Sequence, residues 1–142
     1  MVIAIDFDGT IVQHKYPSIG AEIPFAIDTL KMLIKDRHRL ILWTVREGQF
    51  LEDAIDWCKE RGVEFYSVNK DYPEENINDK GFSRKLKADL FIDDRSLGGL
   101  PDWGEIYHMI NEKRAFLPFN KTRFIPRKLT LLERIYGYTK KD

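Results

Sequence analysis

The sequence is poor in cysteine and lacks long apolar runs, so neither disulfides nor a membrane is expected to stabilise the fold. It contains one cysteine, Cys58, so it cannot form an internal disulfide, which fits a reducing compartment. No apolar run reaches the roughly 20 residues that a membrane span needs, and the apolar start carries Asp6 and Asp8, unlike a signal peptide. Basic and acidic residues number 23 each, so net charge favours neither nucleic acid nor membrane as a partner. We therefore expect a cytoplasmic protein.

What the chain does contain is enough apolar material for one domain. Hydrophobic residues make up 43% of its 142 residues, and 9 Phe, 6 Tyr and 3 Trp give the core bulk. Cys58 lies beside Trp57 in a helical pattern, which favours a packed thiol over a reactive one. We predict a catalytic core over 1–114 and a basic, aromatic extension over 115–142, which contains seven basic and two acidic residues.

The extension leaves two interpretations open. Basic groups can contact phosphates and aromatic rings can stack on bases, which would suit a nucleic acid. The same rings could instead pack on the core or across the interface of a homo-oligomer, with the basic groups reaching water. We favour packing over nucleic-acid binding. The side chains concerned are Lys121, Arg123, Arg127, Lys128, Phe116, Phe119 and Phe124.

Strand and helix patterns alternate along the core. Short apolar runs predict strands at Val2–Asp6, Arg39–Trp43, Val63–Val68 and Ala88–Ile92. Helical periodicity covers 24–36 and 47–61, and a capping box at Asp102 and Glu105 opens a further helix. The polar stretch 69–87 predicts a loop that runs into a short helix. This alternation predicts an α/β fold, a three-layer Rossmann-like sandwich around a parallel sheet.

Polar side chains follow several of these strands at the point where each ends. Asp6 ends the first strand, Thr44 follows the second, and Asp93 and Asp94 follow the fourth. The carboxyl ends of parallel strands share one edge of the sheet, where ligands bind. Carboxylates gathered there repel one another unless a cation is present, and oxygen ligands without nearby Cys or His pairs favour Mg²⁺.

These residues resemble the four motifs of the haloacid dehalogenase superfamily, in the right order and over roughly residues 1–95. The resemblance implies that Asp6 is a nucleophile forming an aspartyl-phosphate and that Asp8 is the general acid and base. It implies that Thr44 hydrogen-bonds the phosphate, with the turn residues Gly9 and Thr10 also at the substrate. The family's Mg²⁺ would be held by Asp6, the backbone carbonyl of Asp8, and Asp93 and Asp94, of which we favour Asp94 as the direct ligand. The family's strand order is 5-4-1-2-3 if a fifth strand exists.

Further cations and a histidine are predicted at the cleft. The resemblance assigns Lys85 to the phosphate, because its position eight residues before the acidic pair matches the spacing in relatives; Lys80 and Lys87 are alternatives. His14, on the loop after the first motif, and Arg46, just past the second, are predicted to contact the substrate; for Arg46 an ion pair with an acid remains open.

No segment is long enough for a cap domain. Residues 11–38 hold only a loop and one helix, and the stretch between Val68 and Lys85 is 16 residues long. Because Asp8 offers a proton to a leaving alkoxide, the pattern favours phosphoryl transfer over dehalogenation. We expect a capless, Mg²⁺-dependent phosphomonoesterase whose substrate is a small phosphorylated metabolite or nucleotide. A polynucleotide or phosphoprotein phosphatase, or a non-catalytic phosphate-binding module, stays open as an alternative.

Overall fold

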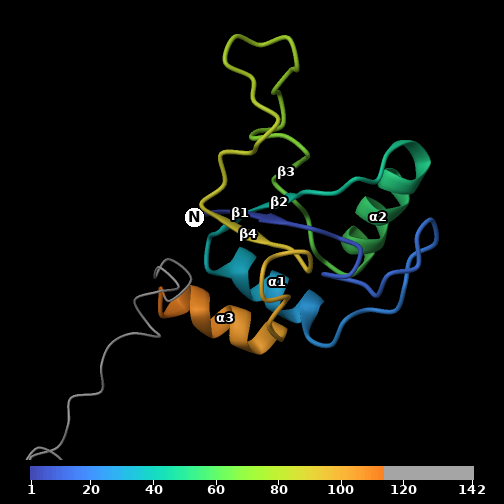
Figure 1. Ribbon diagram of the computed structural model, residues 1–142, viewed down its shortest axis with the longest axis vertical. Helices are drawn as coiled ribbons and strands as arrows, with labels where there is room; N and C mark the ends of the chain where they lie inside the picture. Colours follow the sequence, from blue (N-terminus) through green and yellow to red (C-terminus); the bar gives the residue numbers. More distant parts are fainter. Residues whose placement is uncertain (114–142) are drawn as a thin grey trace, which may run out of the picture.

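The computed structural model describes residues 1–113, in which strands and helices alternate (Figure 1). In chain order the elements are β1 (Val2–Ile5), α1 (Ala26–Lys35), β2 (Arg39–Leu42), α2 (Gly48–Glu60), β3 (Ser67–Val68), β4 (Leu90–Ile92) and α3 (Trp103–Asn111). The strands form one parallel sheet in the order β3-β2-β1-β4. The predicted α/β class, with a central parallel sheet flanked by helices as in a Rossmann-like sandwich, is confirmed.

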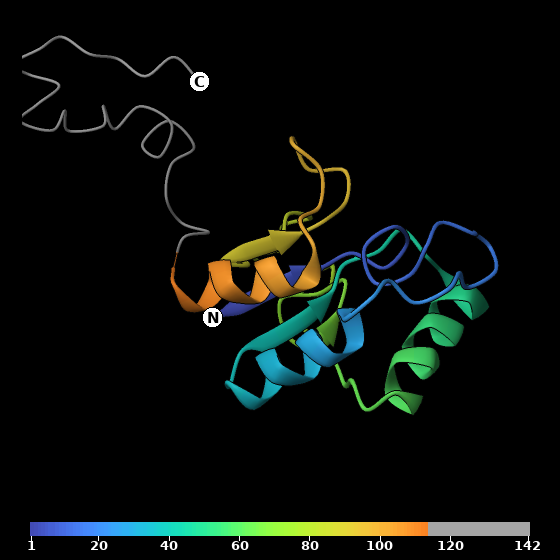
Figure 2. The same ribbon diagram turned by 90° about the horizontal axis from the view of Figure 1, so that it is seen from below.

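The main core lies on one face of the sheet. Ile3 and Ile5 of β1 and Leu40 and Leu42 of β2 are buried there against apolar residues from all three helices. Figures 1 and 2 show α1 and α3 side by side on this face, and the hydroxyl of Thr29 on α1 donates to the first carbonyl of α3 at 3.3 Å. Apolar runs rather than strict alternation are expected in strands covered on both faces.

The opposite face is covered by the segment between β3 and β4. Ala4 and Ile41 are buried there beneath Leu86, a residue of that segment. The short helix predicted within 69–87 does not form; this stretch contains turns and bends instead. Asp71 accepts the backbone N–H of Lys87 at 2.7 Å, which closes the segment into a loop that projects from the sheet in Figure 1.

The ends of several elements follow from local chemistry. The capping box is confirmed, because Asp102 accepts the backbone N–H of Glu105 at 2.9 Å. Helix α1 begins later than the pattern predicts, since Phe25 adopts a left-handed φ of 65°. The strand predicted from Val63 shortens to β3, although Val63 itself is buried in the core.

Cys58 is a core thiol, as predicted. It is buried on α2, and burial raises the pKa of this thiol to about 12. None of the helices within residues 1–113 has the length and apolar character that crossing a bilayer requires. The predicted extension over 115–142 lies outside the described residues.

Candidate active site

The register of the sheet brings the ends of three strands into one row. Ile5, the last residue of β1, is paired with the last residues of both β2 and β4. The residues that follow are Asp6, Trp43 and Asp93. Paired positions of parallel strands project to the same face. The nucleophile candidate therefore has an acid on one side and an indole on the other.

Three carboxylates converge at this edge. Asp6, Asp93 and Asp94 each offer an oxygen, and these atoms lie within 4.8 Å of one another. Asp94 Oδ1 is buried and has no hydrogen-bond partner among residues 1–113. Buried polar atoms are nearly always paired, so such an oxygen fits a ligand position. The donor set, all carboxylate oxygen, fits the Mg²⁺ that the sequence predicts.

The environment of Asp6 opposes its ionisation in the metal-free protein. Burial is the main cause, and it raises the pKa of Asp6 to about 6, with a further contribution from the charges of Asp93 and Asp94. Hydrogen bonds from the Phe7 backbone and the Thr10 side chain act in the opposite direction. A carboxylate that is costly to ionise inside a cleft is typical of functional sites and would gain from a nearby cation.

Thr10 is a buried residue that links two acids of the cluster through hydrogen bonds. Its hydroxyl donates to Asp6 Oδ2 at 3.2 Å and accepts the backbone N–H of Asp94 at 3.0 Å. The indole N–H of Trp103 donates to its carbonyl at 3.0 Å. Since Thr10 is fully buried, it cannot touch a substrate, and the predicted substrate contact is corrected to a structural link between two acids.

Gly9 is required by close approach. Its φ is +95°, and a Cβ built there would collide with the His14 imidazole and the Asp94 carboxylate. The absence of a side chain thus lets the loop after β1 lie against the acidic cluster. His14 Nε2 is 2.9 Å from Asp94 Oδ2 and about half of this side chain is exposed. His14 therefore contacts a metal-ligand candidate, whereas its predicted contact with the substrate stays a prediction.

Arg46 is paired with Asp8 instead of facing the cleft. Nε donates to Asp8 Oδ2 at 2.6 Å and Nη2 donates to Oδ1 at 2.7 Å. The guanidinium is fully buried and lies over the ring of Phe7 at 5.0 Å. The predicted substrate contact is corrected here, because a buried and fully engaged guanidinium has no free face for a ligand. The ion pair left open at the sequence level is formed, with Asp8 as the acid.

The same arginine anchors the loop after the first motif. Nη1 donates to the carbonyl of Pro17 at 3.0 Å, and Nη2 donates to that of Ser18 at 2.9 Å. The ring of Tyr16 lies 5.3 Å from the guanidinium carbon on this loop. One buried side chain thus connects Asp8, the loop after the first motif and the start of the loop after β2.

Thr44 lines the cleft, held by a residue that the sequence did not single out. The backbone N–H of Thr44 donates to the Asn69 side chain at 2.9 Å, and the Asn69 amide donates back to the Thr44 carbonyl at 2.9 Å. Asn69 follows β3 directly, so its place at the carboxyl edge of the sheet was the signal available in the sequence.

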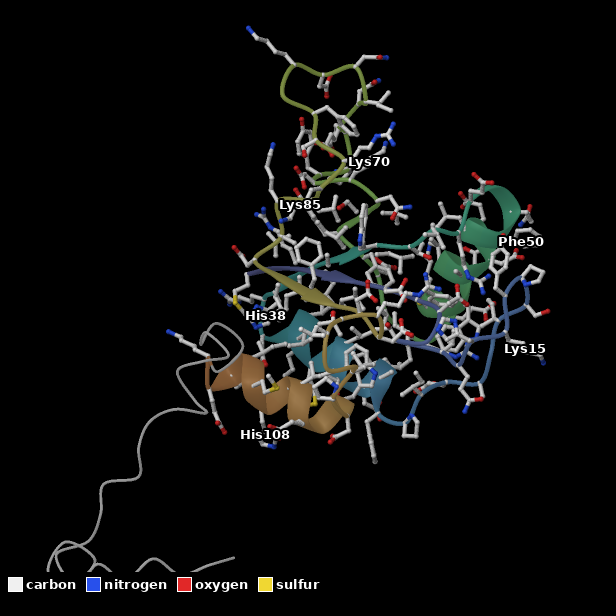
Figure 3. The ribbon with its side chains drawn as sticks, viewed as in Figure 1. Lys15, His38, Phe50, Lys70, Lys85 and His108 are labelled. Carbon is white, nitrogen blue, oxygen red and sulfur yellow. The ribbon has the colours of Figure 1, made fainter. Side chains whose placement is uncertain are left out.

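The structure does not bring Lys85 to this cleft. Asp71 holds the backbone of Lys87, and Lys85 lies exposed on the segment that leads into β4. Figure 3 shows Lys85 at the base of the loop between β3 and β4, well separated from Lys15 on the loop after β1. The alternatives Lys80 and Lys87 are also exposed, and Lys87 Nζ lies 3.5 Å from Asp71 Oδ2. Among residues 1–113, none of these three lysines lines the cleft.

The cleft itself is small and mixed in character. Its volume is about 180 Å³, and it is open to solvent. Acids form its floor, while an indole, an exposed valine and an arginine form its rim. The lining residues are Asp6, Asp8, Trp43, Thr44, Val45, Asp93 and Arg95.

The comparisons with known proteins inform the fold more than the chemistry. No family model matches the chain, and no curated protein matches it. It is similar to a solved structure, that of a conserved protein coded by a locus from Bacteroides thetaiotaomicron. The two sequences are 68% identical, the match covers 82% of this chain and 93% of that chain, and the TM-score is 0.77. The chain belongs to the family of that conserved protein. The description of that protein names no reaction or ligand, so the case for a function rests on the cleft.

Proposed function

We propose that this protein is a Mg²⁺-dependent phosphomonoester hydrolase of the haloacid dehalogenase type. The acidic cluster is the observation that carries the proposal: Asp6, Asp93 and Asp94 offer oxygens within 4.8 Å, and Asp94 Oδ1 has no partner among the described residues. Like charges at this distance call for a cation. When bound, Mg²⁺ would offset the charge of a phosphate beside Asp6.

In the proposed reaction a carboxylate oxygen of Asp6 attacks phosphorus, and the bond from phosphorus to the leaving oxygen breaks. Asp8 gives that oxygen a proton, which releases the alcohol. Asp8 then takes a proton from the water that hydrolyses the aspartyl-phosphate, which restores Asp6 and releases inorganic phosphate. Thr44, at the end of the neighbouring strand, is the hydrogen-bond donor for a phosphate oxygen.

Arg95 replaces Lys85 as the cation in this proposal. It lines the cleft together with Asp6 and Asp93, whereas Lys85 is exposed on the segment before β4. A planar guanidinium with several N–H donors suits phosphate oxygens. Its exposure at the rim leaves the side chain free to follow a bound phosphate.

The substrate in this proposal is a small phosphorylated molecule, and the protein works in the cytoplasm. An open cleft of about 180 Å³ admits a phosphate group, and a single cysteine fits a reducing compartment.

A non-catalytic phosphate-binding module is the second candidate. It is favoured by the engagement of both Asp8 oxygens by Arg46, because an acid that gives a proton needs one of them. Lys85, the predicted phosphate cation, is also exposed and does not line the cleft. Such a module would bind phosphate and Mg²⁺ without turnover.

The deciding experiment is hydrolysis of a generic aryl phosphate with and without Mg²⁺. We expect Mg²⁺-dependent turnover in the wild type and its loss in Asp6→Asn. The matched control is Asp56→Asn, which removes an exposed aspartate of α2 and should leave turnover unchanged. Turnover that survives in Asp6→Asn would refute the mechanism. Binding of inorganic phosphate without any turnover by the wild type would favour the module.

A further inference from the structure

Apolar side chains stand unexpectedly close to the acidic cluster. Val45 is 85% exposed and lines the cleft together with Asp6 and Asp93. A single exposed apolar residue needs no explanation. Val45, however, lines the cleft together with Trp43. These two apolar residues, which stand on either side of Thr44 in the chain, form what we call the apolar wall of the cleft. If the ligand were phosphate alone, these two apolar side chains would have no apolar partner in it.

Trp43 is held as a fixed platform. It packs against the cluster of Ala4, Ile41 and Leu86 on one face of the sheet, and it also lines the cleft. The register places it next to Asp6 in the row of strand ends. An indole that is anchored on one side and faces a cleft on the other can stack on a flat ring with little loss of side-chain freedom.

The dimensions of the cleft place the leaving group on this wall. Pockets that enclose a drug-sized ligand measure roughly 300–1,000 Å³, whereas this cleft measures about 180 Å³. It therefore holds the phosphate on the acidic floor, and whatever the phosphate is attached to must lie along the rim. At the rim, this part of the ligand can contact the apolar wall of Trp43 and Val45 and the exposed guanidinium of Arg95.

We propose that Trp43 and Val45 form a subsite for a flat aromatic ring carried by the leaving group, which makes the substrate a phosphate ester of the nucleoside monophosphate class, with the nucleoside as the leaving alcohol. This inference rests on the proposed phosphatase function. The base stacks on the indole and covers Val45, while Arg95 meets a polar edge of the same molecule. A hexose phosphate would instead place several hydroxyl groups against a wall that offers them a single donor, the indole N–H of Trp43, which is less favourable.

The test compares three phosphates in Mg²⁺: a nucleoside 5′-monophosphate, a hexose 6-phosphate and glycerol phosphate. We expect the wild type to prefer the nucleotide over glycerol phosphate by about tenfold or more in kcat/KM, which is the scale of one stacked ring. Trp43→Leu should raise KM for the nucleotide about tenfold with little change in kcat, and should change KM for glycerol phosphate much less. Trp43→Phe, which keeps a ring, should retain most of the preference.

Val45→Ser keeps the test decisive if Trp43→Leu does not fold. Val45 is 85% exposed, so this change does not disturb the core, and KM for the nucleotide should rise severalfold. The matched control is Ile77→Ser, which removes an apolar side chain that is 67% exposed and is absent from the lining of the cleft. Ile77→Ser should behave as the wild type on all three substrates.

Failure of the subsite proposal and failure of the phosphatase proposal give different results. Equal kcat/KM for the three phosphates, a preference for hexose phosphate, or variants that weaken all three alike would overturn the subsite and leave the phosphatase function standing. If the folded wild type hydrolyses none of them, and the generic aryl phosphate is also untouched, the phosphatase function is refuted and the subsite with it.

Discussion

Arg46 and Asp8 form a buried, two-point ion pair, with N–O distances of 2.6 and 2.7 Å. Because the same guanidinium donates to the carbonyls of Pro17 and Ser18, the loop after the first motif and the acid in the cleft share one anchor. For Asp8 to give a proton to a leaving group, one of its oxygens must exchange its contact with Arg46 for the substrate. In the proposed mechanism, Arg46 thus sets the position of the Asp8 carboxylate.

Arg46→Ala should destabilise the fold strongly. It leaves the largely buried Asp8 carboxylate without its partner, and breaking a buried pair in this way costs about 3–5 kcal/mol. Arg46→Lys should recover only part of the loss, since an ammonium cannot make the two-point contact. Urea unfolding followed by circular dichroism measures both variants.

The matched control is Arg61→Ala. Arg61 also lies over an aromatic ring, 3.8 Å from the centroid of Trp57, and donates to a backbone carbonyl at 2.9 Å. Its side chain is 37% exposed, so we expect a loss of about 1 kcal/mol or less. Equal losses for Arg46→Ala and Arg61→Ala would contradict the anchoring role of Arg46.

Asp6→Asn should stabilise the metal-free protein above pH 6. Burial raises the pKa of Asp6 in the folded state to about 6 from 3.8. Stability from neutral Asp6 is therefore greatest below about pH 4 and is lost as pH rises through 6. The neutral amide avoids this loss, so the variant should exceed the wild type by about 1–2 kcal/mol at pH 7.5, after allowance for solvent screening.

Thermal unfolding in chelator from pH 4 to 8 measures this difference. The two proteins should converge at the acidic end of the range and separate as pH rises. A constant difference across the range would show that ionisation of Asp6 does not cause it.

Mg²⁺ should raise the melting temperature of the wild type. A ligand that binds only the folded state at a concentration 100 times its Kd stabilises by about 2.7 kcal/mol, equivalent to several degrees. Asp94→Asn should abolish the rise and Asp93→Asn should weaken it less, because Asp94 Oδ1 is the oxygen without a partner among residues 1–113. Asp56→Asn, on the outer face of α2, should respond as the wild type does. An undiminished rise in Asp94→Asn would remove the acidic cluster as the metal site.

The fold and the acidic floor were accessible from the sequence because they depend on short-range patterns. The apolar run of β1 predicts a buried strand, and the rule that parallel strands end at one edge then brings Asp6, Thr44 and Asp93 together. The rule does not say which residues are neighbours along that edge. The register of β1 and β2 shows that Trp43 lies beside Asp6.

The errors concern side chains whose direction depends on distant segments. Arg46 follows Thr44 closely and resembled a cleft cation, but carbonyls of the loop at Pro17 and Ser18 turn it inward. Lys85 was assigned to the phosphate by its spacing of eight residues from Asp93, and spacing alone does not fix the path of the segment before β4. That segment has few apolar residues to bury and closes through a hydrogen bond to Asp71 instead.

Gly9→Ala should damage the metal site more than the fold. The φ of +95° alone makes alanine unfavourable by more than about 1 kcal/mol, and the added Cβ would also displace the His14 ring and the Asp94 carboxylate. Gly81→Ala separates these effects, because Gly81 has a φ of +94° and nothing within 4 Å of an added Cβ. Both variants should lose similar stability, as measured by thermal unfolding in chelator. Gly9→Ala alone should lose the Mg²⁺-dependent rise in melting temperature and at least tenfold in turnover. Equal responses of the two variants to Mg²⁺ would mean that contact of the turn with Asp94 is not needed to shape the site.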